Sequence, residues 1–192
     1  LSATDIDIGD NLTYTLVSSP GYGNVTITNN QILFTPFDNL SSVSSFSDNF
    51  TFQVSDGNLT DNATITLTVQ GSNDRPVAYD NSSAGTVVED SPGNITLSAT
   101  DIDIGDNLTY TLVSQPSYGN VSISNNQILF TPFDNLSSGS SFSDNFTFEV
   151  KDSANATDTA VVTLTVVGSN DSPVAIAGSG SSITEDSPDN IT

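Results

Sequence analysis

Phe146-Thr147-Phe148-Glu149-Val150 carries an apolar side chain at every second position, and this alternation decides the fold class. Successive side chains of a β-strand point to opposite faces, so the segment offers one face to a core and one to water. The same pattern occurs in Leu108–Leu112 and Val162–Val166. No stretch has the 3.6-residue spacing of a helix. The sequence therefore predicts half-buried strands.

Shorter strand candidates are bounded by Asn, Asp, Gly, Ser or Pro, which supply turn geometry. They are Asn94–Ala99, Asn120–Ser124, Gln127–Thr131 and Gly85–Val88. About seven strands with turns every 8–12 residues predict an all-β fold, an antiparallel two-sheet sandwich of immunoglobulin-like type. Cys and Trp are absent, so the core must consist of Phe, Tyr, Leu, Ile and Val.

The chain repeats itself, since residues 1–56 and 97–152 are identical at 49 of 56 positions. A period of this length, on the order of 100 residues, suits one small independent domain rather than a solenoid unit. We expect 1–76 to be a repeat lacking its first strand, 77–173 to be a complete repeat, and 174–192 to be the opening strand segment of a third.

The two ends of the chain match each other, because Asn190-Ile191-Thr192 followed by Leu1 re-creates the internal run Asn94–Leu97. One explanation is that the chain is a window on a longer tandem array. The other is a discrete subunit whose residues 174–192 supply the opening strand of the next copy. Both predict that this tail pairs with the sheet containing residues 11–17 or 64–69 of a neighbouring repeat or identical chain in a filament.

The composition excludes several function classes. With 23 acidic against two basic residues, the net charge is −21, which repels nucleic acid and anionic lipid. His, Cys and Met are absent, which removes imidazole bases, thiol nucleophiles and ligands for soft metals. No apolar run is long enough to insert into a membrane. We expect no enzyme and no catalytic residue, because near-identical copies suit multivalent or mechanical roles better.

Asn-x-Ser/Thr sequons are frequent and predict an extracellular, cell-surface glycoprotein. A turn Asn followed by a strand with outward Thr explains the same pattern without any glycan. Asn170 is the weakest sequon because Pro173 follows its Ser. The glycosylation candidates are Asn11, Asn24, Asn39, Asn49, Asn58, Asn62, Asn81, Asn94, Asn107, Asn120, Asn135, Asn145, Asn155 and Asn190.

Carboxylates recur at fixed repeat positions, and these positions are the candidate metal ligands. Asp5 and Asp7 recur as Asp101 and Asp103, and Asn73-Asp74 recurs as Asn170-Asp171. Oxygen ligands in flexible geometry are typical of calcium, and alternate Asp residues in an extended loop point the same way. Two alternatives remain: the Asp residues bond their own backbone in turns, or the acidity is a halophile's hydrated surface.

The repeat resembles the cadherin-like tandem repeats, about 95 residues each, of giant prokaryotic surface proteins and adhesins. Four motifs carry the resemblance: Ala99–Asp103, Phe130-Thr131-Pro132, Asn145–Asp152 and Asn170–Ala175, with first-copy counterparts. The resemblance implies cadherin-like sandwich domains with calcium as cofactor between them. It nominates Asn73, Asp74, Asp101 and Asp103 at the first junction and Glu89, Asn170 and Asp171 at the second. No counterpart of the cadherin Asp-Arg-Glu segment is present, which implies one or two ions.

The resemblance also implies a function. We expect a structural repeat of an extracellular surface filament or adhesin stalk, stiffened by calcium at the junctions between domains. The alternative is an adhesive binding module that recognises a cell-surface glycan or protein, and Tyr22 and Tyr118 are its candidate contacts. We expect the remaining acids and aromatics to be structural: Asp38, Asp48, Asp134 and Asp144 in turns, and Phe34, Phe37, Phe130 and Phe133 in the core.

Overall fold

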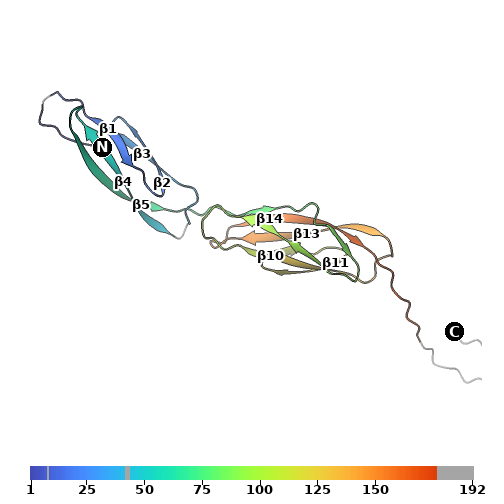
Figure 1. Ribbon diagram of the computed structural model, residues 1–192. Helices are drawn as coiled ribbons and strands as arrows, with labels where there is room; N and C mark the ends of the chain where they lie inside the picture. The colour runs from blue at the N-terminus through green and yellow to red at the C-terminus, as the bar shows by residue number, and fades with distance from the viewer. Residues whose placement is uncertain (8, 42–43, 177–192) are drawn as a thin grey trace, which may run out of the picture.

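The chain folds into two β-sandwich units arranged in series in an elongated molecule (Figure 1). This computed structural model describes residues 1–7, 9–41 and 44–176. The first unit contains β1 (Thr13–Ser18), β2 (Gly23–Thr28), β3 (Gln31–Pro36), β4 (Ser45–Ser55) and β5 (Thr60–Gln70). The second contains β6 (Val77–Tyr79), β7 (Thr86–Val88), β8 (Gly93–Thr96), β9 (Ser98–Thr100), β10 (Thr109–Ser114), β11 (Gly119–Ser124), β12 (Gln127–Pro132), β13 (Ser141–Lys151) and β14 (Thr157–Val167).

Two layers form the sandwich of the second unit. One layer is a sheet of order β10-β13-β14-β7, in which β7 runs parallel to β14. The other consists of β11-β12-β8 and the pair β6-β9. The long hairpin of β13 and β14 keeps one register from Ser141↔Val167 to Lys151↔Thr157, so each strand presents every second residue to the core. The predicted all-β class and the immunoglobulin-like sandwich are confirmed.

Two strand predictions differ from the structure. The segment expected as one strand, Asn94–Ala99, is divided between β8 and β9, which pair with different strands. Leu97 separates them, is buried, and donates its backbone N–H to the carbonyl of Asn126 at 2.8 Å. The strand β6 was not predicted, because three residues are too few to show an alternating pattern.

The core of the second unit lies between the two layers. Phe146 and Phe148 of β13, Phe130 of β12 and Val162 of β14 are fully buried. Phe37 of the first unit and Phe133 of the second were expected in the cores of their units, and that prediction is wrong, since they are 40% and 39% exposed. In β12 the inward positions are Ile128, Phe130 and Pro132, so the next residue points outward.

The same apolar positions are less covered in the first unit. Phe34 is only half-buried, whereas its counterpart Phe130 has no exposed surface. Ala63 is exposed, whereas its counterpart Ala160 is 3% exposed. In the second unit β7 and β6 cover this side of the sandwich, and among the described residues the first unit has no such strands. The two copies therefore differ in packing although their sequences nearly agree.

A buried carboxylate organises the turn after the first long strand in each unit. Asp144 Oδ1 accepts the backbone N–H of Ser117 and Asn145, and its Oδ2 accepts that of Tyr118. Asp48 does the same for Gly21, Tyr22 and Asn49 in the first unit. Both residues were expected in turns, and that prediction is wrong, since they lie in β4 and β13 and their carboxylates hold a turn from across the sheet. Asp38 and Asp134 lie in turns, as expected.

Replacing Asp48 tests this arrangement. Burial raises the pKa of Asp48, but the three backbone N–H donors together hold it below its ordinary value of 3.8. A lowered folded-state pKa stabilises the protein above the unfolded pKa, and that stability is lost as pH falls through the folded value. Asp48→Ala should therefore destabilise the first unit by roughly 1–3 kcal/mol at pH 7 in urea unfolding, because the donors lose their acceptor. The deficit should shrink below about pH 4.

The control for this variant is Asp38→Ala, which removes an acid from an exposed turn and should change the unfolding free energy by less than about 0.5 kcal/mol. A deficit for Asp48→Ala that stays constant down to pH 2 would show that the charge of Asp48 contributes nothing to stability.

Candidate metal centre

Three carboxylates converge in the loop between β9 and β10. One oxygen each of Asp101, Asp103 and Asp106 lies within 4.8 Å of the other two. Asp103 is only 3% exposed, and the other two are half-buried. Asp101 Oδ2, Asp103 Oδ1 and Asp106 Oδ2 are buried and have no hydrogen-bond partner. Buried polar atoms are nearly always paired, so three buried, unpaired carboxylate oxygens in one loop make this segment the candidate cation site.

The other oxygens of these residues build the loop. Asp101 Oδ1 accepts the backbone N–H of Asp103 at 2.9 Å, as in an Asx turn. Gly105 has a φ of 92°, a left-handed conformation that lets the loop return Asp106 toward Asp103. The turn interpretation and the ligand interpretation of this segment are therefore compatible, because they use different oxygens of the same side chains.

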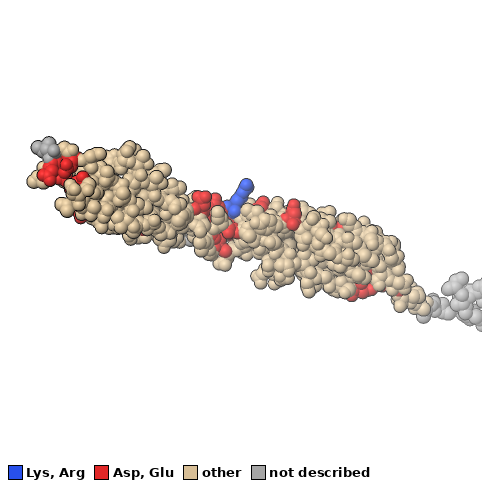
Figure 2. Space-filling view, turned by 45° about the horizontal axis from the view of Figure 1, so that its top comes forward, with Lys and Arg blue, Asp and Glu red and all other residues tan. Residues whose placement is uncertain are grey.

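The linker between the units closes one side of this cluster. The backbone N–H of Asp74 donates to Asp103 Oδ2 at 2.9 Å, and Asn73 Nδ2 donates to Asp152 Oδ2 at 2.9 Å. Ile104 adds a bond from its N–H to the carbonyl of Asn39 in the first unit at 3.2 Å. Acidic side chains are gathered at this junction in the space-filling view (Figure 2). The structure thus brings together all four residues expected at the first junction.

Sequence reasoning missed two members of the site, Asp106 and Asp152. Asp152 follows β13, is 3% exposed, and accepts the backbone N–H of Ala156 on Oδ1 at 2.8 Å. Both residues had a detectable signal, because they recur in the other copy as Asp10 and Asp56. Asp106 lies only three residues after Asp103 in the same loop, whereas Asp152 lies far along the chain, and only the fold places Asp152 beside this loop.

Negative charge accumulates in this site. Burial and the neighbouring charges of Asp101, Asp103 and Asp152 raise the pKa of Asp106. Burial also opposes ionisation of Asp152, but the hydrogen bonds from Asn73 and nearby backbone N–H groups hold its pKa below the ordinary value. Within the described ranges, neither Arg75 nor Lys151 forms an ion pair with these carboxylates.

The chemistry of the donor set fits a hard divalent cation. Calcium binds oxygen at about 2.3–2.6 Å, so two of its ligands can be up to roughly 5.2 Å apart. The oxygens of Asp101, Asp103 and Asp106 satisfy this limit with separations within 4.8 Å. With no His or Cys in the chain, the donors at this site are oxygens, which favours calcium over zinc or copper.

The first unit carries a related cluster, in which the counterpart of Asp152 takes the place of the counterpart of Asp103. Oxygens of Asp5, Asp10 and Asp56 lie within 4.8 Å of one another, but Asp5 and Asp10 are exposed. Asp7 is also exposed and donates its backbone N–H to Asp5 Oδ1 at 2.9 Å. The copy therefore has the same loop but lacks the burial that the linker gives the second unit.

The candidates expected at the second junction lie at the opposite end of the second unit. Glu89 is 2% exposed, and its two oxygens accept the backbone N–H groups of Leu136 and Ser169 at 2.8 and 2.7 Å. Loss of hydration and the charges of Asp171, Glu89 and Asp134 raise the pKa of Asp90. Asn170 is exposed and donates to the carbonyl of Asp171 at 3.2 Å. Both oxygens of Glu89 are already paired, unlike those of the Asp101 cluster.

Known proteins resemble this chain in sequence profile and in fold. Residues 1–68 and 73–165 match the bacterial Ig domain family. The human mucin-like protocadherin EC1-2 structure has a TM-score of 0.51 at 25% identity, over 86% of this chain and 88% of that one. The human CDH23 EC21-23 structure has a TM-score of 0.52 at 20% identity, over 87% and 66%.

A search of the curated proteins finds no match. No helix in the described part of the chain is long and apolar enough to cross a membrane. The neighbours in fold are tandem cadherin repeats, and the profile match covers both copies of the repeat. The chain therefore belongs to the bacterial Ig domain family, and its sandwich units have the fold of cadherin repeats.

Proposed function

We propose that this chain is a structural segment of an extracellular surface filament or adhesin stalk, and that calcium stiffens the junctions between its domains. The observation that supports this most is the set of three buried, unpaired carboxylate oxygens of Asp101, Asp103 and Asp106. They lie where the linker from the preceding unit is hydrogen-bonded to the same side chains.

The ion would be held by Asp101, Asp103 and Asp106 of the second unit, and Asp152, whose two oxygens already accept hydrogen bonds, lies beside them. The positive charge of the ion would neutralise the negative charges of these carboxylates. The linker participates because the backbone N–H of Asp74 is bonded to Asp103, one of these ligands, and Asn73 is bonded to the neighbouring Asp152. When the carboxylates are neutralised, these bonds hold the linker against the second unit. When the carboxylates are not neutralised, their mutual repulsion loosens the loop to which the linker is attached.

Membership of the bacterial Ig domain family and the elongated arrangement of the two units support a place on a prokaryotic cell surface (Figure 1). Glycosylation belongs to the same proposal. Of the described sequon residues among the candidates, all are exposed except Asn39 and Asn81, which are half-buried. Oligosaccharides there would cover outward-facing strand surface and restrict pairing with foreign strands.

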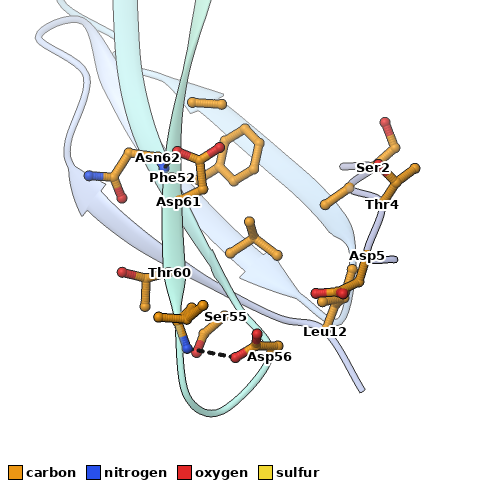
Figure 3. Close-up of a pocket in the computed structure, with 14 residues that line it drawn as sticks. Ser2, Thr4, Asp5, Leu12, Phe52, Ser55, Asp56, Thr60, Asp61 and Asn62 are labelled. Carbon is orange, nitrogen blue, oxygen red and sulfur yellow. Dashed lines mark hydrogen bonds between the residues drawn. The ribbon is translucent and has the colours of Figure 1, made fainter. Parts of the chain in front are cut away.

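The adhesive alternative has less support. A ligand site that belongs to the repeat should recur in both copies, yet the hollow beside Phe52 of the first unit (Figure 3) is occupied by β6 at the equivalent place in the second. Tyr22 and Tyr118, the aromatic candidates, stack on Phe46 and Phe142 with ring centroids 4.5 Å apart in both cases. Their rings are therefore engaged in packing within each unit.

Removing two ligands should abolish calcium binding at the junction. We expect calcium to bind the wild-type chain with a Kd of roughly 10⁻⁴–10⁻³ M, the range of extracellular modules. Asp101→Asn with Asp103→Asn should weaken this by at least about tenfold in isothermal titration. The matched control is Asp38→Asn with Asp134→Asn, which makes the same charge change in exposed turns and should bind normally. Equal affinity in both double variants would exclude this site.

Calcium should also set the angle between the units. Small-angle X-ray scattering should show a well-defined maximum dimension with calcium and a broader, shorter distribution with chelator, because the linker loosens before the sandwiches unfold. The Asp101→Asn, Asp103→Asn variant should scatter like the chelated wild type under both conditions. Identical scattering of the wild type with and without calcium would contradict the stiffening role.

Native material should carry glycans at equivalent positions of the two copies. We expect modification of Asn24 together with Asn120, and of Asn49 together with Asn145, since all four are exposed. Glycopeptide mass spectrometry of protein from its original source checks this. Peptide masses that all equal the bare polypeptide would leave turn and strand geometry as the cause of the sequons.

A further inference from the structure

The two units, which lie end to end (Figure 1), make a direct contact besides the linker that joins them. The backbone N–H of Ile104, in the loop between β9 and β10, donates to the backbone carbonyl of Asn39 at 3.2 Å. Asn39 follows β3 of the first unit, and we call residues 39–41 the docking turn. The side chain of Ile104 is 69% exposed, so backbone groups make this contact.

The docking turn is more covered than its counterpart in the second unit. Leu40 is 7% exposed, and the other two residues of the turn are half-buried. The equivalent residues 135–137 are more exposed at each of the three positions. In its core the second unit is the better-covered copy, so the packing within the repeat does not explain this difference. The loop that carries Ile104 lies against the docking turn, and this contact accounts for the cover.

Gly71 holds the docking turn close to the linker. It lies directly after β5, and its N–H donates to the carbonyl of Ser44 at 3.3 Å. A Cβ atom at this position would lie 2.2 Å from the carbonyl oxygen of Ser41 and 2.5 Å from that of Leu40. Both are backbone atoms, which cannot turn aside as the end of a flexible side chain can. Glycine is therefore required here by the close approach of two backbones.

The same close approach occurs in the second unit. Gly168 follows β14, and a Cβ atom there would lie 2.3 Å from the carbonyl oxygen of Ser137. The N–H of Gly168 donates to the carbonyl of Ser140 at 2.9 Å. The contact between glycine and turn is therefore a feature of the repeat, and the internal junction adds Ile104 to it.

The contacts at the junction form a closed circuit. Gly71 lies against the docking turn, and three residues later the N–H of Asp74 donates to Asp103 Oδ2 at 2.9 Å. The next residue of that loop, Ile104, donates back to the docking turn. Two consecutive residues of the second unit are thus attached to the linker and to the body of the first unit. One attachment at the linker would let the second unit rotate about it, whereas two attachments oppose that rotation.

We propose that the docking turn is the surface of the first unit that receives the second unit and sets the angle between them, with Gly71 as its positioning residue. The inference rests on the proposed structural role of the chain and identifies the contact through which a cation would act. A cation bound in the acidic loop would hold Asp103 in place, and Ile104 follows Asp103 directly. The docking contact itself needs no ion, since it joins two neutral backbone groups.

A disulfide across the contact tests the docking turn. The chain has no Cys, so Asn39→Cys with Ile104→Cys introduces a single pair of thiols, and position 104 keeps its backbone N–H. Oxidised glutathione should convert this pair to an intramolecular disulfide, because hydrogen-bonded backbones lie within reach of such a bridge. The matched control is Asn135→Cys with Ile104→Cys, whose first position lies at the opposite end of the second unit. It should form no intramolecular disulfide.

The cross-link also separates the docking contact from the cation. In small-angle X-ray scattering with chelator, the oxidised Asn39→Cys, Ile104→Cys chain should keep the well-defined maximum dimension that we expect for the wild type with calcium. The same chain after reduction should loosen with chelator, as the wild type does. The angle between the units would then be fixed by the docking turn while no cation is bound.

Two glycine variants test the positioning role. Gly71→Ala and Gly168→Ala introduce the same steric conflict, the first at the internal junction and the second at the far end of the second unit. In Gly71→Ala the docking turn should move away from the linker, so the amide hydrogen of Ile104 should exchange with solvent at least about tenfold faster by NMR. In Gly168→Ala it should exchange as in the wild type. Circular dichroism checks that both variants fold, and the cross-link decides the question if Gly71→Ala does not.

Three results would overturn the inference: no intramolecular disulfide between positions 39 and 104, an oxidised chain that scatters like the reduced chain after chelator has loosened the latter, or equal exchange of the Ile104 amide in the two glycine variants. Calcium binding by the wild type is measured separately by titration. A wild type that binds no calcium would contradict the calcium proposal, and the disulfide and exchange comparisons would still decide on the docking turn, because neither requires an ion.

Discussion

The rest of the structure depends on the contacts that β6 and β7 make with β9 and β14 in the second unit. These short strands contribute little surface of their own, yet they lie along β9 and β14 and bury Val162 and Leu164. They also follow the linker directly, so their position places Asn73 and Asp74 against Asp152 and Asp103. The same segment therefore completes the core of the second unit and forms the junction between the two units.

The first unit shows what remains without that contact. Its strands pair as in the second unit, with the same register in the hairpin of β4 and β5. Its core is nevertheless half-open, and its acidic loop is exposed although the sequence is almost unchanged. Domain integrity in this family member therefore depends on residues that precede the loop on the chain. The segment that links the two units is therefore also part of the fold of the second unit.

Acidic residues in this chain serve different purposes, and their hydrogen bonds distinguish them. Asp48, Asp144 and Glu89 are buried with backbone donors on both oxygens, so their charges are satisfied by the fold itself. Asp101 and Asp103 use one oxygen in the loop or the linker and leave the other buried without a partner. Counting carboxylates would not separate these groups. The unpaired oxygens separate the two groups, because burying a charged oxygen without a partner costs free energy.

The sequence by itself determined the strands, the repeat and the Asp-x-Asp loop, because alternation and turn residues act over a few neighbouring positions. Phe146 and Phe148 could be placed in the core from their pattern alone. The tertiary structure decided what depends on distant parts of the chain: the division of residues 94–99 between β8 and β9, the outward position of Phe133, and the approach of Asp152 to Asp106. It also decided that apolar side chains are buried more deeply in one copy than in the other, although the two sequences nearly agree. This burial depends on which segment lies along the edge of each sheet.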